Sequence, residues 1–285
     1  MRLPNLVRDL AVTLDLVDIG INLAHDSYDR DRAEVIERAR AAGVSHLIVT
    51  GSSLASTRRA IELAREYPAI IRGTAGIHPH HAAEFELADL PALRQLLQSD
   101  EVCAAGECGL DYFRKFSPHE DQQRVFRWQL ELAVESHKPA FLHQRDAHAD
   151  FSAVLRDYMP QLSGAVAHCF TGNARELDEC LALGLYIGIT GWICDERRGA
   201  HLKALVARIP AERLLLETDG PYLQPRDLKP KPSSRRNEPS YLPHILTTVA
   251  RHRREAVAEV ARATTDNARR LFGWPRANGD PSSTS

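Results

Sequence analysis

Short apolar runs alternate along this chain with longer stretches in which apolar residues recur every three or four positions. Continuous apolar runs of a few residues are typical of strands buried on both faces, and the longer spacing is typical of amphipathic helices. One such stretch, residues 32–43, ends on glycine, a residue that commonly terminates helices. The eight runs that we predict to be strands are residues 16–21, 46–50, 72–77, 102–106, 140–142, 165–167, 186–190 and 214–216.

This repeated order predicts an α/β protein with one domain, a single (β/α)8 TIM barrel over residues 16–274. A dinucleotide-binding Rossmann sheet is a weaker alternative, because only Gly20 stands where the dinucleotide fingerprint needs three glycines. Residues 1–15 precede the pattern, and we expect them to form an N-terminal extension. Residues 275–285 are rich in Pro and Ser, and we expect a disordered tail.

Composition excludes several classes of protein. With 44% apolar and 26% charged residues among 285, the chain is neither mainly disordered nor collagen-like nor a coiled coil. No apolar run is long enough to span a bilayer, and charge and proline interrupt the first ten residues, so we expect neither a membrane span nor a secretory signal. The five cysteines form no CxxC pair, which indicates reduced thiols and a cytoplasmic protein.

The formal net charge of −2 supplies no general attraction for polyanions. A protein of this charge that binds nucleic acid needs a local basic cluster or a metal ion.

Polar residues stand at the carboxyl ends of the predicted strands, where a barrel brings side chains from every strand to one site. A lone histidine in such a place is more often a hydrogen-bonded core residue than a ligand. Three histidines with two carboxylates favour a metal site, because imidazole and carboxylate are the usual ligands of catalytic divalent ions. The eight residues are Asn22, Thr50, His78, Glu107, His143, His168, Thr190 and Asp219.

These residue types predict metal-assisted hydrolysis. An ion held by Glu107, His143 and His168 with an open position lowers the pKa of bound water. Asp219 is expected to bind that ion, to take a proton from the water, or to do both. We find no GxSxG elbow and no activated cysteine motif that would indicate covalent catalysis. The same ligands accept Mg²⁺, Mn²⁺ or Zn²⁺.

Several segments that carry these residues resemble the signature segments of the TatD family of metal-dependent deoxyribonucleases. The similarity runs from about Asp18 to Phe272, in the order that the family shows. The matching segments are residues 75–80 (AGIHPH), 106–112 (GECGLDY), 141–147 (FLHQRDA), 168–172 (HCFTG), 217–222 (ETDGPY) and 231–239 (KPSSRRNEP).

The resemblance implies a TIM-barrel hydrolase of the amidohydrolase superfamily that uses Mg²⁺ or a similar divalent ion. It implies a 3′→5′ exonuclease that prefers single-stranded DNA and serves DNA repair or fragmentation. By position, Glu107, His143, His168 and Asp219 match the family's metal-site residues, with Glu107 and Asp219 as catalytic groups. His78 matches a histidine expected to contact substrate phosphate.

One segment departs from the family pattern. Most members carry His-x-His at the end of the first strand, where this chain has Gly20-Ile21-Asn22. Glycine has no ligating side chain and an amide is a poor ligand, so we place Asn22 among the substrate-binding residues. We expect one firm metal site at Glu107, His143 and His168, and a weaker second site that substrate phosphate helps to complete.

Residues 226–236 follow the last predicted strand and carry five basic residues against one acidic residue. We expect Arg235 and Arg236 to clamp substrate phosphates, although a solvated connecting loop is an alternative reading. Asn237, Glu238 and Pro239 are expected instead to organise this loop by capping the next helix.

Other residues near the predicted site have less specific signals. Arg145, a candidate for substrate binding, and Asp111 are expected to hydrogen-bond the ligands. Tyr112, Phe113 and Trp192 would either stack on bases or pack their loops. Strand alternation turns Cys108 and Cys169 away from the site, and we expect His80 and His81 at the loop surface.

Three functions remain open from the sequence: a monomeric deoxyribonuclease, a metal-dependent amide or ester hydrolase, and a barrel that only binds a partner. The second would act on a small molecule or on aminoacyl-tRNA, and Gly220 beside Asp219, where alanine is more usual, would reshape its pocket. The ligand set argues against the third, since a binding module has no need of it.

Overall fold

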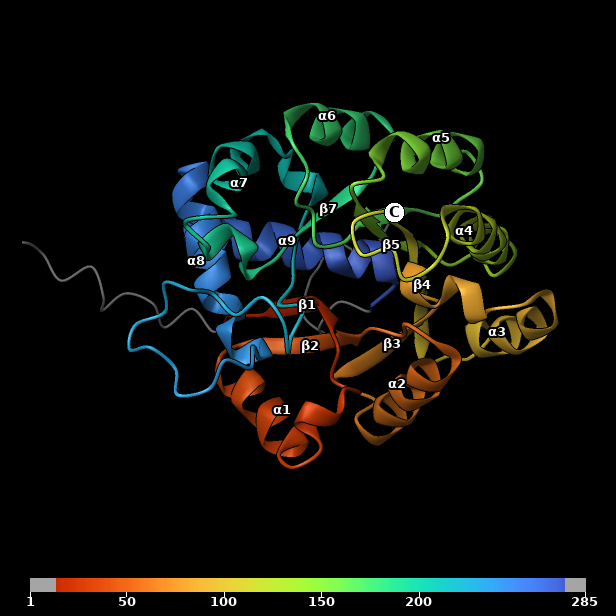
Figure 1. Ribbon diagram of the computed structural model, residues 1–285. Helices are drawn as coiled ribbons and strands as arrows, with labels where there is room; N and C mark the ends of the chain where they lie inside the picture. Colours follow the sequence, from red (N-terminus) through yellow and green to blue (C-terminus); the bar gives the residue numbers. More distant parts are fainter. Residues whose placement is uncertain (1–13, 275–285) are drawn as a thin grey trace, which may run out of the picture.

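Eight parallel strands, hydrogen-bonded in chain order from β1 to β8, form the centre of the molecule (Figure 1). The computed structural model describes residues 14–274, so residues 1–13 and the tail 275–285 lie outside it. The strands are β1 (Leu16–Ile21), β2 (Val44–Val49), β3 (Ile71–Ala75), β4 (Val102–Asp111), β5 (Ala140–Arg145), β6 (Ala165–Ala167), β7 (Tyr186–Ile189) and β8 (Leu214–Leu216).

Helices surround the strands and cover their outer faces (Figure 1). Among residues 14–274, no helix is both long and apolar enough to cross a membrane. The helices are α1 (Arg32–Ala41), α2 (Leu54–Glu66), α3 (Leu90–Leu97), α4 (His119–Glu135), α5 (His148–Tyr158), α6 (Ala174–Ala182), α7 (Ala200–Leu205), α8 (Leu242–Arg253) and α9 (Val257–Phe272).

The sheet is closed where β1 meets the chain just after β8. The Asp219 backbone N–H donates to Gly20 O at 2.8 Å, and Asn22 N–H donates to the Gly220 carbonyl at 2.8 Å. Beneath these bonds, the buried Asp18 carboxylate accepts the Thr218 backbone N–H at 2.9 Å. We call this junction the seam. It confirms the predicted (β/α)8 barrel.

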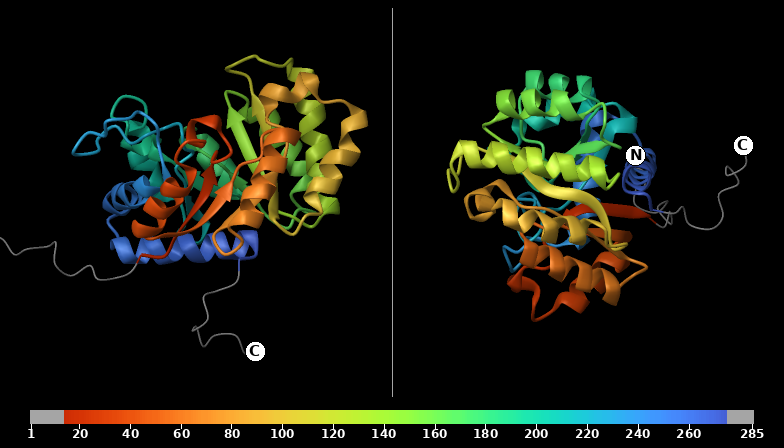
Figure 2. Two further views of the ribbon diagram at one scale, coloured as in Figure 1. Left: turned by 90° about the horizontal axis from the view of Figure 1, so that it is seen from below. Right: turned by 90° about the vertical axis from the view of Figure 1, so that its right-hand side faces the viewer.

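Helix α9 fills one end of the barrel. Leu271 and Phe272 of α9 belong to one buried cluster with inward residues of the strands, among them Phe141 and Leu215. In the left view of Figure 2, α9 lies along one end of the barrel, and the long loop after β8 lies at the other. Within residues 14–274, only the end formed by the carboxyl termini of the strands is therefore open for a site.

Two strands, β4 and β5, extend at their carboxyl ends beyond the predicted runs. The ladder between β4 and β5 continues to the pair Asp111 and Arg145, so Glu107 and His143 lie within strands rather than after them. Backbone groups pair regardless of side-chain polarity, which explains why apolar runs underestimate strands that end in a polar site.

Candidate active site

A cavity of about 640 Å³ opens at the carboxyl ends of the strands. Six of the eight predicted strand-end residues line it: Asn22, His78, Glu107, His143, His168 and Asp219. Thr50 and Thr190 are not among its lining residues and are 2% and 1% exposed. The polar groups that the topology was expected to gather are thus together, except for the two threonines.

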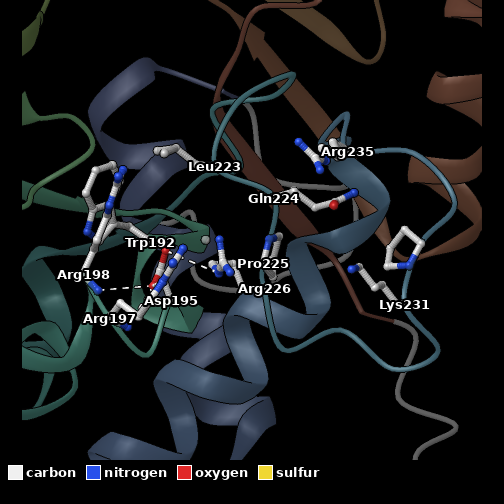
Figure 3. A pocket seen from close by; sticks show the side chains of 12 residues that line it. Trp192, Asp195, Arg197, Arg198, Leu223, Gln224, Pro225, Arg226, Lys231 and Arg235 are labelled. Atoms are coloured by element: carbon white, nitrogen blue, oxygen red, sulfur yellow. Dashed lines mark hydrogen bonds and ion pairs between the residues drawn. The ribbon is translucent and has the colours of Figure 1, made fainter.

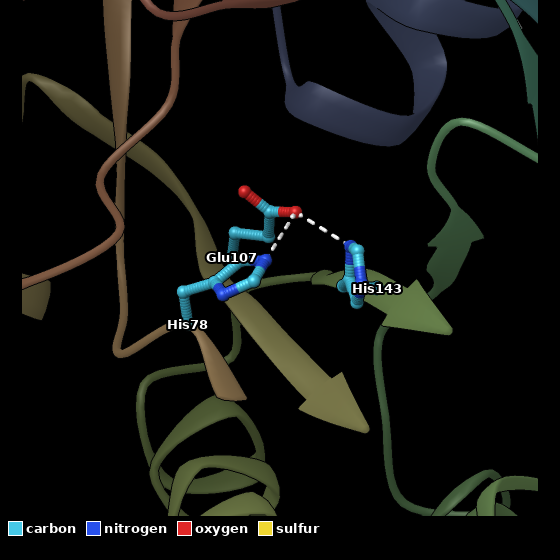
Figure 4. Close-up of side chains that lie close together, drawn as sticks. All are labelled: His78, Glu107 and His143. Carbon is cyan, nitrogen blue, oxygen red and sulfur yellow. Dashed lines mark hydrogen bonds and ion pairs between the residues drawn. The ribbon is translucent and has the colours of Figure 1, made fainter. Parts of the chain in front are cut away.

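The Glu107 carboxylate stands at the centre of this group. Its Oε1 lies 3.0 Å from His143 Nδ1, 3.4 Å from His168 Nε2 and 3.5 Å from His78 Nε2. Figure 4 shows His78 and His143 converging on Glu107 from two sides. One carboxylate oxygen therefore faces three imidazoles that come from different parts of the barrel.

Local backbone geometry brings Glu107 into this position. The register of β4 on β5 shifts between Gly106 and Cys108, so Glu107 has no direct partner on β5. Gly106 has φ +139°, and a Cβ there would lie 2.2 Å from the carbonyl oxygen of Phe141, so only glycine fits. Cys108 is fully buried in the outer core, which confirms that it points away from the site.

Glu217 holds His168 from below. Its carboxylate accepts the His168 Nδ1–H at 2.5 Å and the Cys169 backbone N–H at 2.6 Å. The proton on Nδ1 leaves Nε2 of the neutral ring with a lone pair directed at the cavity. Glu217 was not predicted as a site residue, although a charged residue that directly follows an apolar strand can indicate one.

The place of Gly20 is explained by Glu217. A Cβ at position 20 would lie 2.4 Å from Glu217 Oε2, and one at Gly188 would lie 2.3 Å from Glu217 Oε1. The Glu217 carboxylate thus occupies the space that a side chain at position 20 would need. Two residues later, Asn22 donates its Nδ2–H to Asp219 Oδ1 at 3.1 Å. Asn22 therefore holds Asp219.

A second histidine–carboxylate group also lines the cavity. Asp111 Oδ2 lies 3.3 Å from His143 Nε2, which confirms the expected contact between Asp111 and a site histidine. The same oxygen lies 2.9 Å from His80 Nε2. The expectation that His80 lies at the loop surface was wrong, because the turn after β3 folds its ring back onto Asp111.

The comparisons with known proteins agree with this geometry. The model of a family described as "TatD related DNase" matches residues 17–273. The "3'-5' ssDNA/RNA exonuclease TatD" of Pantoea vagans (strain C9-1) is 52% identical over 257 residues, covering 90% of this chain and 99% of that protein. The protein of that name in Escherichia fergusonii is 50% identical over 258 residues, with the same coverage of each chain. The chain belongs to the TatD family.

Solved structures of TatD proteins have the same fold. YJJV, a TatD homologue from Escherichia coli K12, superposes with a TM-score of 0.84 at 28% identity, covering 92% of this chain and all of that one. A TatD-family hydrolase from Entamoeba histolytica also gives 0.84 at 28% identity, covering 91% of this chain and 98% of its own.

The electrostatics of this TatD site favour bound positive charge. Burial by itself raises the pKa of Glu107, but His78, His168 and the hydrogen bond from His143 outweigh burial and hold the pKa well below its usual range. Burial lowers the pKa of His168, yet the charges of Glu217 and Glu107 raise it to about 10. The carboxylates around His168 thus favour positive charge at this position, from a proton or from a bound cation.

Asp219 is a site carboxylate whose ionisation is disfavoured by burial and by its neighbours. Burial raises its pKa to about 7, with repulsion from Glu107 and Glu217 opposed by attraction to His168. A cation beside these carboxylates would remove this penalty.

The donor set fits a divalent cation. His168, Cys169 and Asp219 offer ligand atoms within 4.8 Å of one another, and His143 Nδ1 lies 3.0 Å from Glu107 Oε1. Carboxylates are typical ligands of Mg²⁺ and Mn²⁺, and neutral imidazoles are typical ligands of Zn²⁺. The residues present can therefore hold the metal on which the TatD family depends.

His78 differs from the other two histidines. Its Nδ1 accepts the His80 backbone N–H at 3.1 Å, so the proton of the neutral ring is on Nε2, which faces the cavity. Burial lowers the pKa of His78 to about 3, which keeps the ring neutral. An Nε2–H group donates hydrogen bonds and cannot ligate, so His78 suits a phosphate oxygen better than a metal ion.

Two further expectations near the site were wrong. Cys169 lines the cavity, because its φ of +46° breaks the strand alternation on which the expectation was based. Arg145 lines the cavity too, but its guanidinium stacks 3.8 Å above the Phe113 ring instead of hydrogen-bonding a ligand. Tyr112 packs on its own loop, stacked at 3.6 Å on His119.

The structure separates the two arginines of the basic segment. Arg236 binds Asp31 of the turn before α1 through two contacts of 2.7 and 2.6 Å, and it lies over the Tyr28 ring. Arg235 lines a neighbouring cavity instead. Asn237 belongs to the organisation of the loop, since its Nδ2–H donates to the Thr218 carbonyl at 2.8 Å.

Proposed function

We propose that this protein is a divalent-metal-dependent exonuclease that shortens single-stranded DNA, and RNA as its relatives' names indicate, from the 3′ end. One observation supports this most directly: the Glu107 carboxylate, ringed by three imidazoles within 3.5 Å, lies in an open cavity of a TatD-family barrel. The printed name of relatives at about half identity describes this activity.

Glu107, His143, His168 and Asp219 would hold the ion, and we propose Mg²⁺ for it. When bound, a divalent ion neutralises phosphate charge and lowers the pKa of a water molecule, which is the chemistry that phosphodiester hydrolysis requires. The imidazoles also suit Mn²⁺ and Zn²⁺, so all three ions belong in the test.

The chain's own groups would position the substrate and move the proton. Asn22 occupies Asp219 Oδ1, which leaves Oδ2 to accept the proton of the attacking water. His78 Nε2–H would donate to a non-bridging phosphate oxygen, and Arg145 at the rim would face a neighbouring phosphate. These roles of Asn22, His78 and Arg145 are proposals.

Digestion of end-labelled DNA tests the proposal. Metal-stripped protein is incubated with 3′- or 5′-labelled single strands, and Mg²⁺, Mn²⁺ or Zn²⁺ is then added back. We expect no cleavage without metal and, with metal, a ladder that shortens one nucleotide at a time from the 3′ end. Protein that binds a metal but cleaves no strand with any ion would contradict the proposal.

The position of Gly220 argues against the alternative function, hydrolysis of small esters or amides. A Cβ there would meet the Tyr28 hydroxyl at 2.6 Å and the Ile21 side chain at 2.7 Å, so this glycine serves packing. Gly220 is not among the residues that line the cavity. Monomeric state, cytoplasmic location and a role in DNA repair stay predictions.

A further inference from the structure

A second cavity, of about 600 Å³, lies beside the active site. It is bordered by the loop after β7 and the loop after β8, and we call it the loop cavity (Figure 3). Trp192, Arg198 and Leu223 line both cavities, so the two are neighbours that share a wall. A polymer whose end lies in the active site can continue into the loop cavity.

The loop cavity concentrates positive charge in a chain whose formal net charge is −2. Its one lining carboxylate, Asp195, lies 3.7 Å from Arg226 and 3.9 Å from Arg197. The remaining cations that line it are Arg198, Lys231 and Arg235, and within residues 14–274 none of them has an ion pair. Three cations that face one hollow without carboxylate partners suit an anion of matching spacing.

Hydrogen bonds within residues 224–236 hold the loop after β8 in place. Gln224 donates its Nε2–H to the carbonyls of Ser234 at 3.0 Å and Arg236 at 3.1 Å. Asp227 lies 2.7 Å from His244 of α8, which ties the other part of the loop to the barrel. The backbone that carries Lys231 and Arg235 is therefore held in place before a ligand arrives, which reduces the entropic cost of binding.

Trp192 stands at the wall between the two cavities. A Cβ at Gly191 would lie 2.2 Å from the Leu223 carbonyl oxygen, which shows how closely the two loops approach beside the indole. The Arg198 guanidinium lies 5.8 Å from the Trp192 ring. An aromatic face beside cations is the arrangement with which proteins bind single strands without reading sequence.

We propose that the loop cavity is a further nucleotide subsite, which binds the part of a single strand that lies 5′ of the two nucleotides joined by the scissile phosphate. Arg198, Lys231 and Arg235 bind its phosphates, and a base lies against Trp192. The inference rests on the proposed function, because a strand that is cut from its 3′ end leaves its 5′ part outside the active site. A dinucleotide is too short to use this subsite fully.

Comparison of a dinucleotide with a twelve-nucleotide strand tests the subsite. In the Lys231→Ala/Arg235→Ala variant, we expect KM for the long strand to rise at least tenfold, with kcat within twofold. The loss of kcat/KM on the long strand should exceed the loss on the dinucleotide at least tenfold. Each lost phosphate contact should flatten the dependence of log KM on log salt concentration, by about 1.4 in slope for the two.

Matched variants and a binding measurement complete the test. Arg58→Ala/Arg251→Ala removes two exposed charges elsewhere and should leave the long-strand KM within twofold. Binding of a fluorescent strand to metal-stripped protein, followed by anisotropy, should weaken at least tenfold in Trp192→Ala and recover in Trp192→Phe.

The outcomes separate the subsite from the proposed function. Suppose that the wild-type protein cleaves. If the Lys231→Ala/Arg235→Ala variant then loses activity equally on both substrates, or keeps full activity on both, the subsite is overturned while the proposed nuclease stands. If the wild-type protein neither cleaves nor binds a strand, the proposed function fails and the subsite fails with it.

Discussion

Among single residues, Glu217 determines which nitrogen of the neutral His168 ring carries the proton. Its carboxylate accepts from Nδ1 and can donate to neither nitrogen, so the neutral ring presents Nε2 as a lone pair. Since Glu217 is fully buried, water cannot replace it.

Glu217→Gln should therefore weaken metal binding with little change in packing. The amide Nε2–H donates where the carboxylate accepted, which favours the tautomer that carries its proton on Nε2 of His168. We expect metal affinity to fall about 10- to 100-fold, as measured by calorimetric titration with Mn²⁺, and nitrogen NMR of the ring to show the changed tautomer.

The chain offers a matched control for this change. Glu179 lies 3.0 Å from His148 Nε2, a similar pair that does not line the cavity. Glu179→Gln should leave Mn²⁺ affinity unchanged. If both variants bind Mn²⁺ as the wild-type protein does, Glu217 does not position His168.

The sequence predicted the residues that strand topology alone gathers, and missed those that depend on the turns. Glu107, His143 and His168 could be found because a parallel barrel brings all strand ends to one face. The orientation of Cys169 and the return of His80 onto Asp111 depend on backbone dihedrals after the strands. No spacing of residue types records those angles.

At the scale of the strands, the seam between β1 and the end of β8 contains a carboxylate that burial keeps difficult to ionise. Burial raises the pKa of Asp18 from an ordinary 3.8 to about 7, although hydrogen bonds from Thr218 and Gly20 oppose the shift. The folded protein therefore holds a proton at Asp18 over a pH range in which the unfolded chain has released it.

This linkage predicts that the seam loses stability as pH rises. Between about pH 4 and 7 the folded state binds more protons at Asp18 than the unfolded state, so Asp18 lowers the free energy of unfolding by about 1.4 kcal/mol per pH unit. Asp18→Asn is neutral and escapes this loss. Its melting temperature relative to the wild-type protein, measured by calorimetry, should rise across that window and stay level above pH 7.

An exposed aspartate provides the comparison for Asp18. Asp157 has a side chain that is 70% exposed, so Asp157→Asn should show no such trend between pH 4 and 7. If the difference in melting temperature between Asp18→Asn and the wild-type protein is constant over this window, Asp18 is ionised in the folded barrel.

The existence of the strands was predictable, whereas their ends and the closure of the sheet were not. Apolar runs mark the buried middle of each strand, yet β4 and β5 continue through polar residues because their backbones remain paired. Asp18 lies inside an apolar run and gave no signal, since its partner Thr218 is 200 residues away along the chain.

For the whole molecule, the excess of carboxylates in the active site couples metal binding to stability. An ion that binds only the folded state stabilises it by mass action, by about 2.7 kcal/mol at a concentration one hundred times its Kd. Metal-stripped protein should therefore melt at a higher temperature after Mn²⁺ is added, and Glu107→Gln should abolish most of that increase.

A third group of possible ligands serves as the control for this measurement. Cys194, Asp227 and His244 lie within ligand distance of one another outside the active site. Cys194→Ser should keep the full increase in melting temperature. If Glu107→Gln keeps it and Cys194→Ser loses it, the ion that stabilises the protein is bound outside the active site.

Net charge, a property of the whole chain, could not reveal where the cations gather. Arg235 and Arg236 are neighbours in the sequence, yet one lines the loop cavity and the other binds Asp31 at the far side of the loop. The sequence predicted a basic loop near the site, but only the folded loop separates residues that hold its shape from residues that face a ligand.

The closure of the barrel by α9 has a consequence for how the strand enters and the product leaves. Because α9 and the apolar core block the opposite end, a strand cannot thread through the barrel, and every route in or out opens on one face. The released nucleotide must therefore leave on the face of the barrel on which the strand enters. Strand entry and product release therefore share one face of the barrel, which is the face that carries the active site and the loop cavity.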